Sequence, residues 1–63
     1  MNIEASEHFL TAELLMRAYG NGALDGYNCK ENNNPYEQGS QEYEAYNSGC
    51  NYGLALSTQD ALT

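Results

Sequence analysis

The sequence has very few basic residues and no long apolar run. Of its 63 residues only Arg17 and Lys30 are basic, against nine Asp or Glu, so the net charge is −7. Direct nucleic-acid binding needs clustered cations that contact phosphates, and binding to an anionic membrane surface makes the same demand. No stretch approaches the ~20 apolar residues of a membrane span. The composition therefore argues against both kinds of partner.

Residues that favour strands or build large cores are also scarce. Valine and tryptophan are absent, isoleucine occurs once, and phenylalanine occurs once. The lack of β-branched apolar residues disfavours a sheet. Six tyrosines can contribute buried rings, provided that each hydroxyl reaches water or a partner group. We therefore predict an all-α protein with one small domain over residues 1–63, whose stability is marginal at this size.

The cysteines and the histidine form no recognisable reactive or metal-binding pattern. Cys29 and Cys50 are far apart, and His8 is distant from both in sequence. Structural zinc prefers closely spaced ligand pairs, and a Cys–His nucleophile needs a third orienting group in a pocket. The N-terminus lacks the basic region of a signal peptide, so reduced thiols in the cytoplasm are expected. We predict no enzymatic activity, no catalytic residue, no cofactor and no metal.

A first helix is predicted over about residues 6–24. Small and apolar residues recur there at steps of three and four. Gly20, Gly22 and Gly26 each disfavour a helix interior. Their clustering indicates either early fraying or the close approach of a second helix, with Gly26 as the expected C-terminal cap.

A second helix is predicted over about residues 35–55, after a loop at 27–33. Asn34 can cap it, Pro35 suits its first position, and Glu37 stands where a capping-box acid belongs. Residues 57–63 are expected to fray. A heptad-like seam is expected to face the first helix; its members are Tyr36, Tyr43 and Cys50, alternating with Gly39, Tyr46 and Gly53.

Two helices joined by so short a loop predict an antiparallel two-helix hairpin. Cys29 would lie near the turn and Cys50 roughly 22 Å along the second helix, which argues against a disulfide between them. The first helix also has a wide apolar face that would allow two copies to pair as a homodimer. Its residues are Phe9, Leu10, Leu14 and Met16.

The stretch 34–40, Asn-Pro-Tyr-Glu-Gln-Gly-Ser, followed by Tyr43, Tyr46, Gly49 and Gly53, resembles the ribosome modulation factor-like family of small bacterial and phage proteins. In that family an Asn/Cys-Pro-Tyr opens the second helix and a Trp-x-x-Gly follows; Tyr46 and Gly49 stand at the Trp and Gly positions. The resemblance covers about residues 17–53. It implies a two-helix hairpin without enzymatic machinery. The namesake binds ribosomal RNA through a strongly basic surface, from which this acidic chain departs.

The excess of carboxylates suggests a function in protein binding. Glu37, Glu42 and Glu44 are expected on the second helix, where glutamates four to seven residues apart lie roughly 6–10 Å apart, comparable with the phosphates of a strand. Tyr27 and Tyr52 fall outside the seam and could anchor a partner. A solvated face without a partner is the simpler alternative for the same carboxylates.

From these features we predict a small acidic protein that inhibits or modulates a basic, normally nucleic-acid-binding host protein or nucleoprotein complex. It would act as a nucleic-acid mimic in the bacterial cytoplasm, which suits a phage protein with an anti-defence role. The alternative is a ribosome-associated hibernation or translation factor that contacts ribosomal proteins rather than RNA.

Overall fold

The computed structural model describes the backbone of residues 3–28 and 33–62 and, within these ranges, the side chains from Leu10 onward. It contains two helices, α1 (Ile3–Tyr27) and α2 (Gln41–Leu62), which pack against each other. No strand occurs in the described ranges, so the prediction of an all-α fold built from two packed helices is confirmed. Neither helix is long and apolar enough, over its described residues, to span a membrane.

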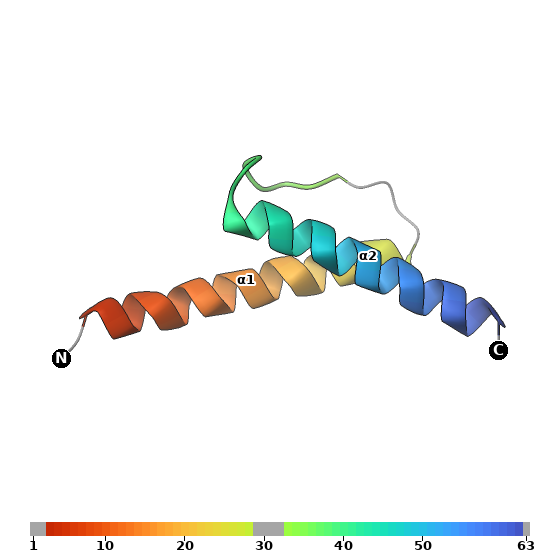
Figure 1. Ribbon diagram of the computed structural model, residues 1–63, viewed down its shortest axis with the longest axis horizontal. Coiled ribbons are helices and arrows are strands. Elements are labelled where there is room, and N and C mark those ends of the chain that lie inside the picture. Colours follow the sequence, from red (N-terminus) through yellow and green to blue (C-terminus); the bar gives the residue numbers. More distant parts are fainter. Residues whose placement is uncertain (1–2, 29–32, 63) are drawn as a thin grey trace.

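The two helices run in the same direction (Figure 1). Gly22 of α1 lies against Tyr46 of α2, and Gly26, one turn later, lies against Cys50. Residue numbers therefore rise together along both helices, whereas in an antiparallel pair one would rise as the other fell. The antiparallel orientation predicted from the sequence is wrong for this reason, although the pairing of the two helices is right.

The length of the connection explains this difference. α1 continues to Tyr27, beyond the predicted end at 24, and α2 begins at Gln41, so thirteen residues (28–40) separate them. A loop over 27–33 alone would have been too short to return along a helix. Thirteen residues can reach roughly 40 Å when extended. The described part of this connection runs back beside α2 to its N-terminal end (Figure 1).

α2 begins at a serine cap rather than at Asn34. The Ser40 hydroxyl accepts a hydrogen bond from the Tyr43 N–H at 3.0 Å, and the Ser40 carbonyl accepts one from the Glu44 N–H at 3.2 Å. A turn precedes the cap, because the Ser40 N–H donates to the Glu37 carbonyl at 3.0 Å. Gly39 sits inside this turn at a φ of 90°, a conformation that glycine tolerates best. The turn forces the helix to start six residues later than predicted.

Asn34 instead attaches the connection to the side of α2. Its side-chain oxygen accepts a hydrogen bond from the Tyr36 N–H at 3.0 Å. Its side-chain nitrogen donates to the Tyr43 carbonyl at 2.9 Å and to the Asn47 side-chain oxygen at 3.1 Å. At the other end α2 is helical up to Leu62, beyond the predicted end near 55. The predicted fraying of residues 57–63 stays a prediction, and Thr63 lies outside the described residues.

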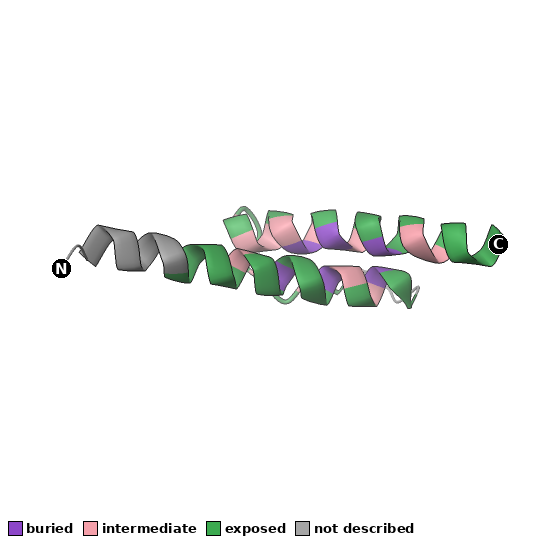
Figure 2. Cartoon of the chain, turned by 90° about the horizontal axis from the view of Figure 1, so that it is seen from below, coloured by how far each residue is buried: buried purple, intermediate pink, exposed green. Residues whose placement is uncertain are grey.

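Glycines of α1 bring the two backbones into contact. A Cβ atom added at Gly22 would overlap the Tyr46 carbonyl oxygen, and one added at Gly26 would overlap the Cys50 carbonyl oxygen. Both glycines are buried. The buried parts of the two helices face each other (Figure 2). Gly26 is therefore a contact residue and not the predicted helix cap. Of the two interpretations of the glycine cluster, close approach is correct for Gly22 and Gly26, while Gly20 has nothing near it.

Glycines of α2 make the reciprocal contacts. A Cβ atom at Gly49 would overlap the Tyr19 carbonyl oxygen, and one at Gly53 would overlap the Ala23 carbonyl oxygen. Each helix thus contributes a Gly-x-x-x-Gly pair, the spacing that lets helix backbones approach closely. Of the predicted seam, Tyr46, Cys50 and Gly53 do lie at this contact. Tyr36 and Gly39 precede α2, and Tyr43 is half-buried beside the connection.

The reciprocal contacts reflect an internal repeat in the sequence. Residues 18–27 (Ala-Tyr-Gly-Asn-Gly-Ala-Leu-Asp-Gly-Tyr) match residues 45–54 (Ala-Tyr-Asn-Ser-Gly-Cys-Asn-Tyr-Gly-Leu) at the alanine, the tyrosine and both contact glycines. Because each helix presents the same motif in the same direction, the pair has an approximate internal twofold relation. The equivalent residues stand 27 positions apart, as 45 − 18 shows.

Candidate binding surface

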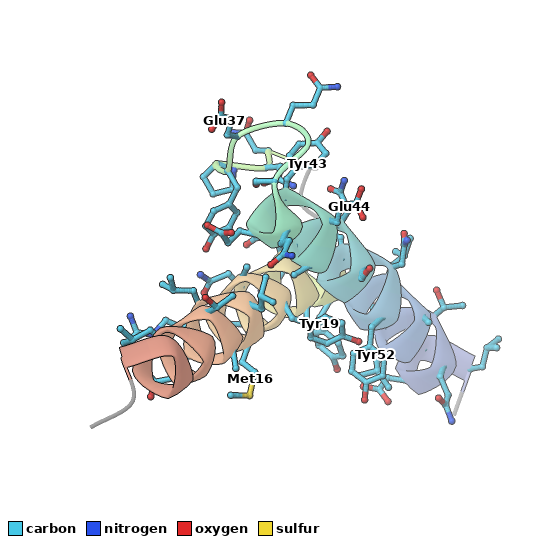
Figure 3. The ribbon with its side chains drawn as sticks, turned by 60° about the vertical axis from the view of Figure 1, so that its left-hand side comes forward. Met16, Tyr19, Glu37, Tyr43, Glu44 and Tyr52 are labelled. Carbon is cyan, nitrogen blue, oxygen red and sulfur yellow. The ribbon has the colours of Figure 1, made fainter. Side chains whose placement is uncertain are left out.

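The three predicted glutamates do not share a face. Glu37 is exposed in the turn before α2. Glu42 lies four residues before the buried Tyr46, hence on the same side of α2, and is half-buried. Glu44 is exposed, about 200° around the helix from Glu42. Figure 3 places Glu37 and Glu44 in the upper part of the molecule with Tyr43. The structure therefore does not bring the three carboxylates into one row.

The two predicted tyrosines belong to a single side of the helix pair. The rings of Tyr52 and Tyr19 pack across the two helices, with centroids 6.0 Å apart and planes tilted by 36°. Eight residues further along each helix, the Tyr27 hydroxyl donates a hydrogen bond to an Asp60 carboxylate oxygen at 2.5 Å. This hydrogen bond and the negative charge of Asp60 raise the pKa of Tyr27. The two contacts lie about two helical turns apart along one surface of the helix pair.

We call this surface the tyrosine face and define it as Met16, Tyr19, Tyr27 and Tyr52. Its side chains are 67%, 38%, 43% and 50% exposed, respectively. Figure 3 shows Met16, Tyr19 and Tyr52 on the side of the molecule away from Glu37 and Tyr43. Large apolar side chains exposed together are typical of interaction surfaces rather than of solvated ones.

The opposite side is covered by the connection. The ring of Tyr36 packs on the ring of Tyr46, with centroids 6.1 Å apart. Tyr46 is only 1% exposed, and its hydroxyl donates a hydrogen bond to the Asp25 carboxylate of α1. That hydrogen bond, together with burial, raises the pKa of Tyr46 well above its ordinary value. This side of the helix pair is thus a small closed core.

The cysteines give no reactive arrangement among the described residues. Cys50 is a free, half-buried thiol at the helix contact. Burial raises the pKa of Cys50, and the nearby Asp25 charge raises it further, so the thiol form is favoured at neutral pH. Within the described residues no group of His, Cys, Asp and Glu could hold a metal ion. Cys29 and His8 lie outside the described side chains, as does Phe9.

Comparisons with protein families, with curated proteins and with solved structures found no match to this chain. The resemblance to the ribosome modulation factor-like family therefore stays a prediction.

Residue patterns alone missed half of the tyrosine face. Met16 was expected on the apolar face of the first helix, and neither Tyr19 nor Asp60, the hydrogen-bond partner of Tyr27, was singled out as a binding residue. The 27-residue repeat is the signal that could have found Tyr19, since it pairs Tyr19 with Tyr46 at equivalent positions of the two helices. It does not reveal that the described part of the connection covers Tyr46 and leaves Tyr19 exposed.

Proposed function

We propose that this chain is a small non-enzymatic binding protein that occupies the basic, normally nucleic-acid-binding surface of another protein. The observation that carries the proposal is the exposed tyrosine face on a chain of net charge −7. Tyrosine is enriched among the residues that dominate binding energy, because its ring supplies contact area at little entropic cost. A strongly negative partner is attracted to the surfaces that nucleic acids also seek.

In this proposal the charges and the tyrosines have different tasks. The carboxylates are spread over several sides, with Glu37 and Glu44 exposed on one part and Asp60 on another. A dispersed negative charge accelerates the encounter with a basic protein without fixing the orientation of the complex. The tyrosine face then supplies the specific contact. For a phage in a bacterial cell, such a protein would serve as an inhibitor of a host nucleic-acid-binding protein.

The test is a pull-down from bacterial lysate with the tagged chain, with and without nuclease, followed by binding measurements on the purified partner. We expect one basic nucleic-acid-binding protein, retained after nuclease treatment, lost in high salt and displaced by its own nucleic acid. Recovery of intact ribosomal subunits would instead favour the hibernation-factor alternative. A recovered protein that binds nucleic acid and this chain at the same time would overturn the proposal.

Charge variants distinguish the effect of the net negative charge on association from direct contacts made by single carboxylates. Glu37→Gln/Glu44→Gln reduces the net negative charge from −7 to about −5 and should slow association with the partner several-fold at low salt, with little change in dissociation. The matched control Glu44→Gln/Gln41→Glu moves one charge while keeping the total, and should associate at the original rate. Equal slowing in both variants would show that Glu44 makes a direct contact instead.

A further inference from the structure

The geometry points to a specific occupant for the tyrosine face: an extended, arginine-bearing segment of the basic partner protein. This inference rests on the proposed function and deepens it, because it names the surface and the chemistry of the contact.

The chain itself shows how a flank of the helix pair accepts an extended segment. On the covered side, the connection around Asn34 lies along α2 and places the Tyr36 ring on Tyr46. The internal repeat places Tyr19 at the position equivalent to Tyr46, on the other flank. Tyr46 is 1% exposed and Tyr19 is 38% exposed. Equivalent sites therefore differ: a segment of the chain covers Tyr46, whereas no described segment covers Tyr19.

The residues around the open site select for cations. At the position equivalent to Asp25 stands Tyr52, so the carboxylate of the covered side is replaced by a second aromatic ring. The tilted pair of Tyr19 and Tyr52 presents ring surface on which a guanidinium group can stack. Arginine stacks on aromatic faces better than lysine, because its planar group is more weakly hydrated.

Carboxylates stand at both ends of this face. Asp60 is bonded to Tyr27 at one end, and Glu13, three residues before Met16 on α1, is exposed at the other. Glu13 and Tyr27 are fourteen residues apart, or about 21 Å along the helix. An extended segment of about six or seven residues covers that length. Arg17, the one Arg or Lys among the described side chains, projects about 200° around α1 from Tyr19 but stands four residues after Glu13, on the same side of α1, so its charge opposes that of Glu13.

The experiment titrates the ¹⁵N-labelled full chain with a defined seven-residue peptide, acetyl-Arg-Ala-Leu-Arg-Ala-Leu-Arg-amide, and follows amide chemical shifts by NMR. Two matched peptides carry lysine or neutral citrulline in place of arginine. We expect the largest shifts at Met16, Tyr19 and Tyr52, binding two- to fivefold tighter for arginine than for lysine, and no binding of the citrulline peptide.

Variants test whether the rings make the contact. Tyr19→Leu/Tyr52→Leu should weaken arginine-peptide binding about tenfold, whereas Tyr19→Phe/Tyr52→Phe keeps both rings and should stay within about twofold. Circular dichroism of each variant checks the helices. Unchanged binding by the leucine variant, or shifts centred on Glu37 and Glu44, would overturn the inference while leaving the proposed function standing. Peptide binding as expected, but no competition with nucleic acid in the pull-down, would overturn the proposed function alone.

Discussion

At the scale of single residues, four glycines replace the side-chain core that this short chain lacks. The only buried apolar side chains among the described residues are Ala18 and Tyr46. The helices instead meet backbone to backbone at Gly22, Gly26 and their counterparts on α2. Where the two backbones meet, the glycine Cα–H groups face carbonyl oxygens of the other helix, and each such contact is worth roughly 0.5–1 kcal/mol. Each glycine is therefore irreplaceable for a steric reason.

This predicts opposite effects for two Gly→Ala substitutions. Gly49→Ala would press a methyl group into the Tyr19 carbonyl, and we expect it to destabilise the fold by about 1–3 kcal/mol or to separate the helices. Gly20→Ala is the matched control, because nothing lies near its Cβ position, and it should stabilise α1 by about 0.8–1 kcal/mol. Urea unfolding followed by circular dichroism measures both. Equal effects would contradict the backbone contact.

Tyr46 predicts a loss of stability at alkaline pH. Its pKa is raised in the folded state, mainly by the hydrogen bond to Asp25, so the folded state holds a proton that the unfolded state releases near pH 10. The stabilisation is present below pH 10 and declines as the pH rises above it. The raised pKa of Cys50 acts in the same direction from about pH 9.

The measurement is the midpoint of thermal unfolding from pH 8 to 11, with tyrosinate absorbance recorded in parallel. We expect one tyrosine to ionise only as the helices separate. Tyr46→Phe should cost about 1.5–3 kcal/mol at pH 8, because Asp25 loses its donor, and its stability should fall less steeply above pH 10. A variant with the same alkaline slope as the original chain would contradict the role of Tyr46.

At the scale of elements, the existence of both helices could be predicted from sequence, but their direction could not. Periodicity placed helices over most of α1 and α2 because small and apolar residues recur at helical steps. The start of α2 was misplaced because Asn34 and Pro35 satisfy the rules for a helix start. In the fold, Asn34 bonds Tyr43 and Asn47 instead, a tertiary use that no local rule contains.

That error also reversed the predicted helix direction, because a short loop excludes a parallel pair and a thirteen-residue connection permits one.

The candidate surface could be predicted only in part. Tyr27 and Tyr52 were singled out because they fall outside the expected seam, and they lie together with Tyr19 and Asp60. The row of glutamates depended on one continuous helix over 35–55. The three glutamates form no such row, because Glu37 precedes α2 and Glu42 is half-buried on the inner side of the helix.

The parallel arrangement predicts a pair of distances. Spin labels at Leu10→Cys with Gln41→Cys, and at Leu10→Cys with Gln59→Cys, share one position on α1 and differ by eighteen residues, or about 27 Å, along α2. In parallel helices the pair ending at residue 59 should be much the longer, whereas an antiparallel hairpin would make the two distances similar. Pulsed electron resonance measures them in a Cys29→Ser/Cys50→Ala background. Alanine suits position 50, since Ala23 is its equivalent in the repeat.

At the scale of the whole molecule, the chain is a single layer measuring 50 × 24 × 12 Å. The thinnest dimension is about the diameter of one helix with its side chains. A single layer has two sides, and the described part of the connection covers one of them. No described segment lies over the tyrosine face, so a partner segment bound there would cover that side as the connection covers the opposite one.

Repulsion among the carboxylates is expected to lower the stability of this small molecule. Nine carboxylates and two cations share a molecule whose long dimension is 50 Å, so repulsion acts between groups within a Debye length of roughly 10 Å at 0.1 M salt. Raising sodium chloride from 10 to 300 mM should stabilise the fold by about 1 kcal/mol, seen as a rise of about 4–8 °C in the unfolding midpoint. Glu37→Gln/Glu44→Gln should show a smaller rise, because less repulsion is left to screen. A midpoint that falls with salt would mean that local attractions outweigh repulsion. The charged groups would then stabilise the fold, and binding to a basic partner would not relieve a repulsion within it.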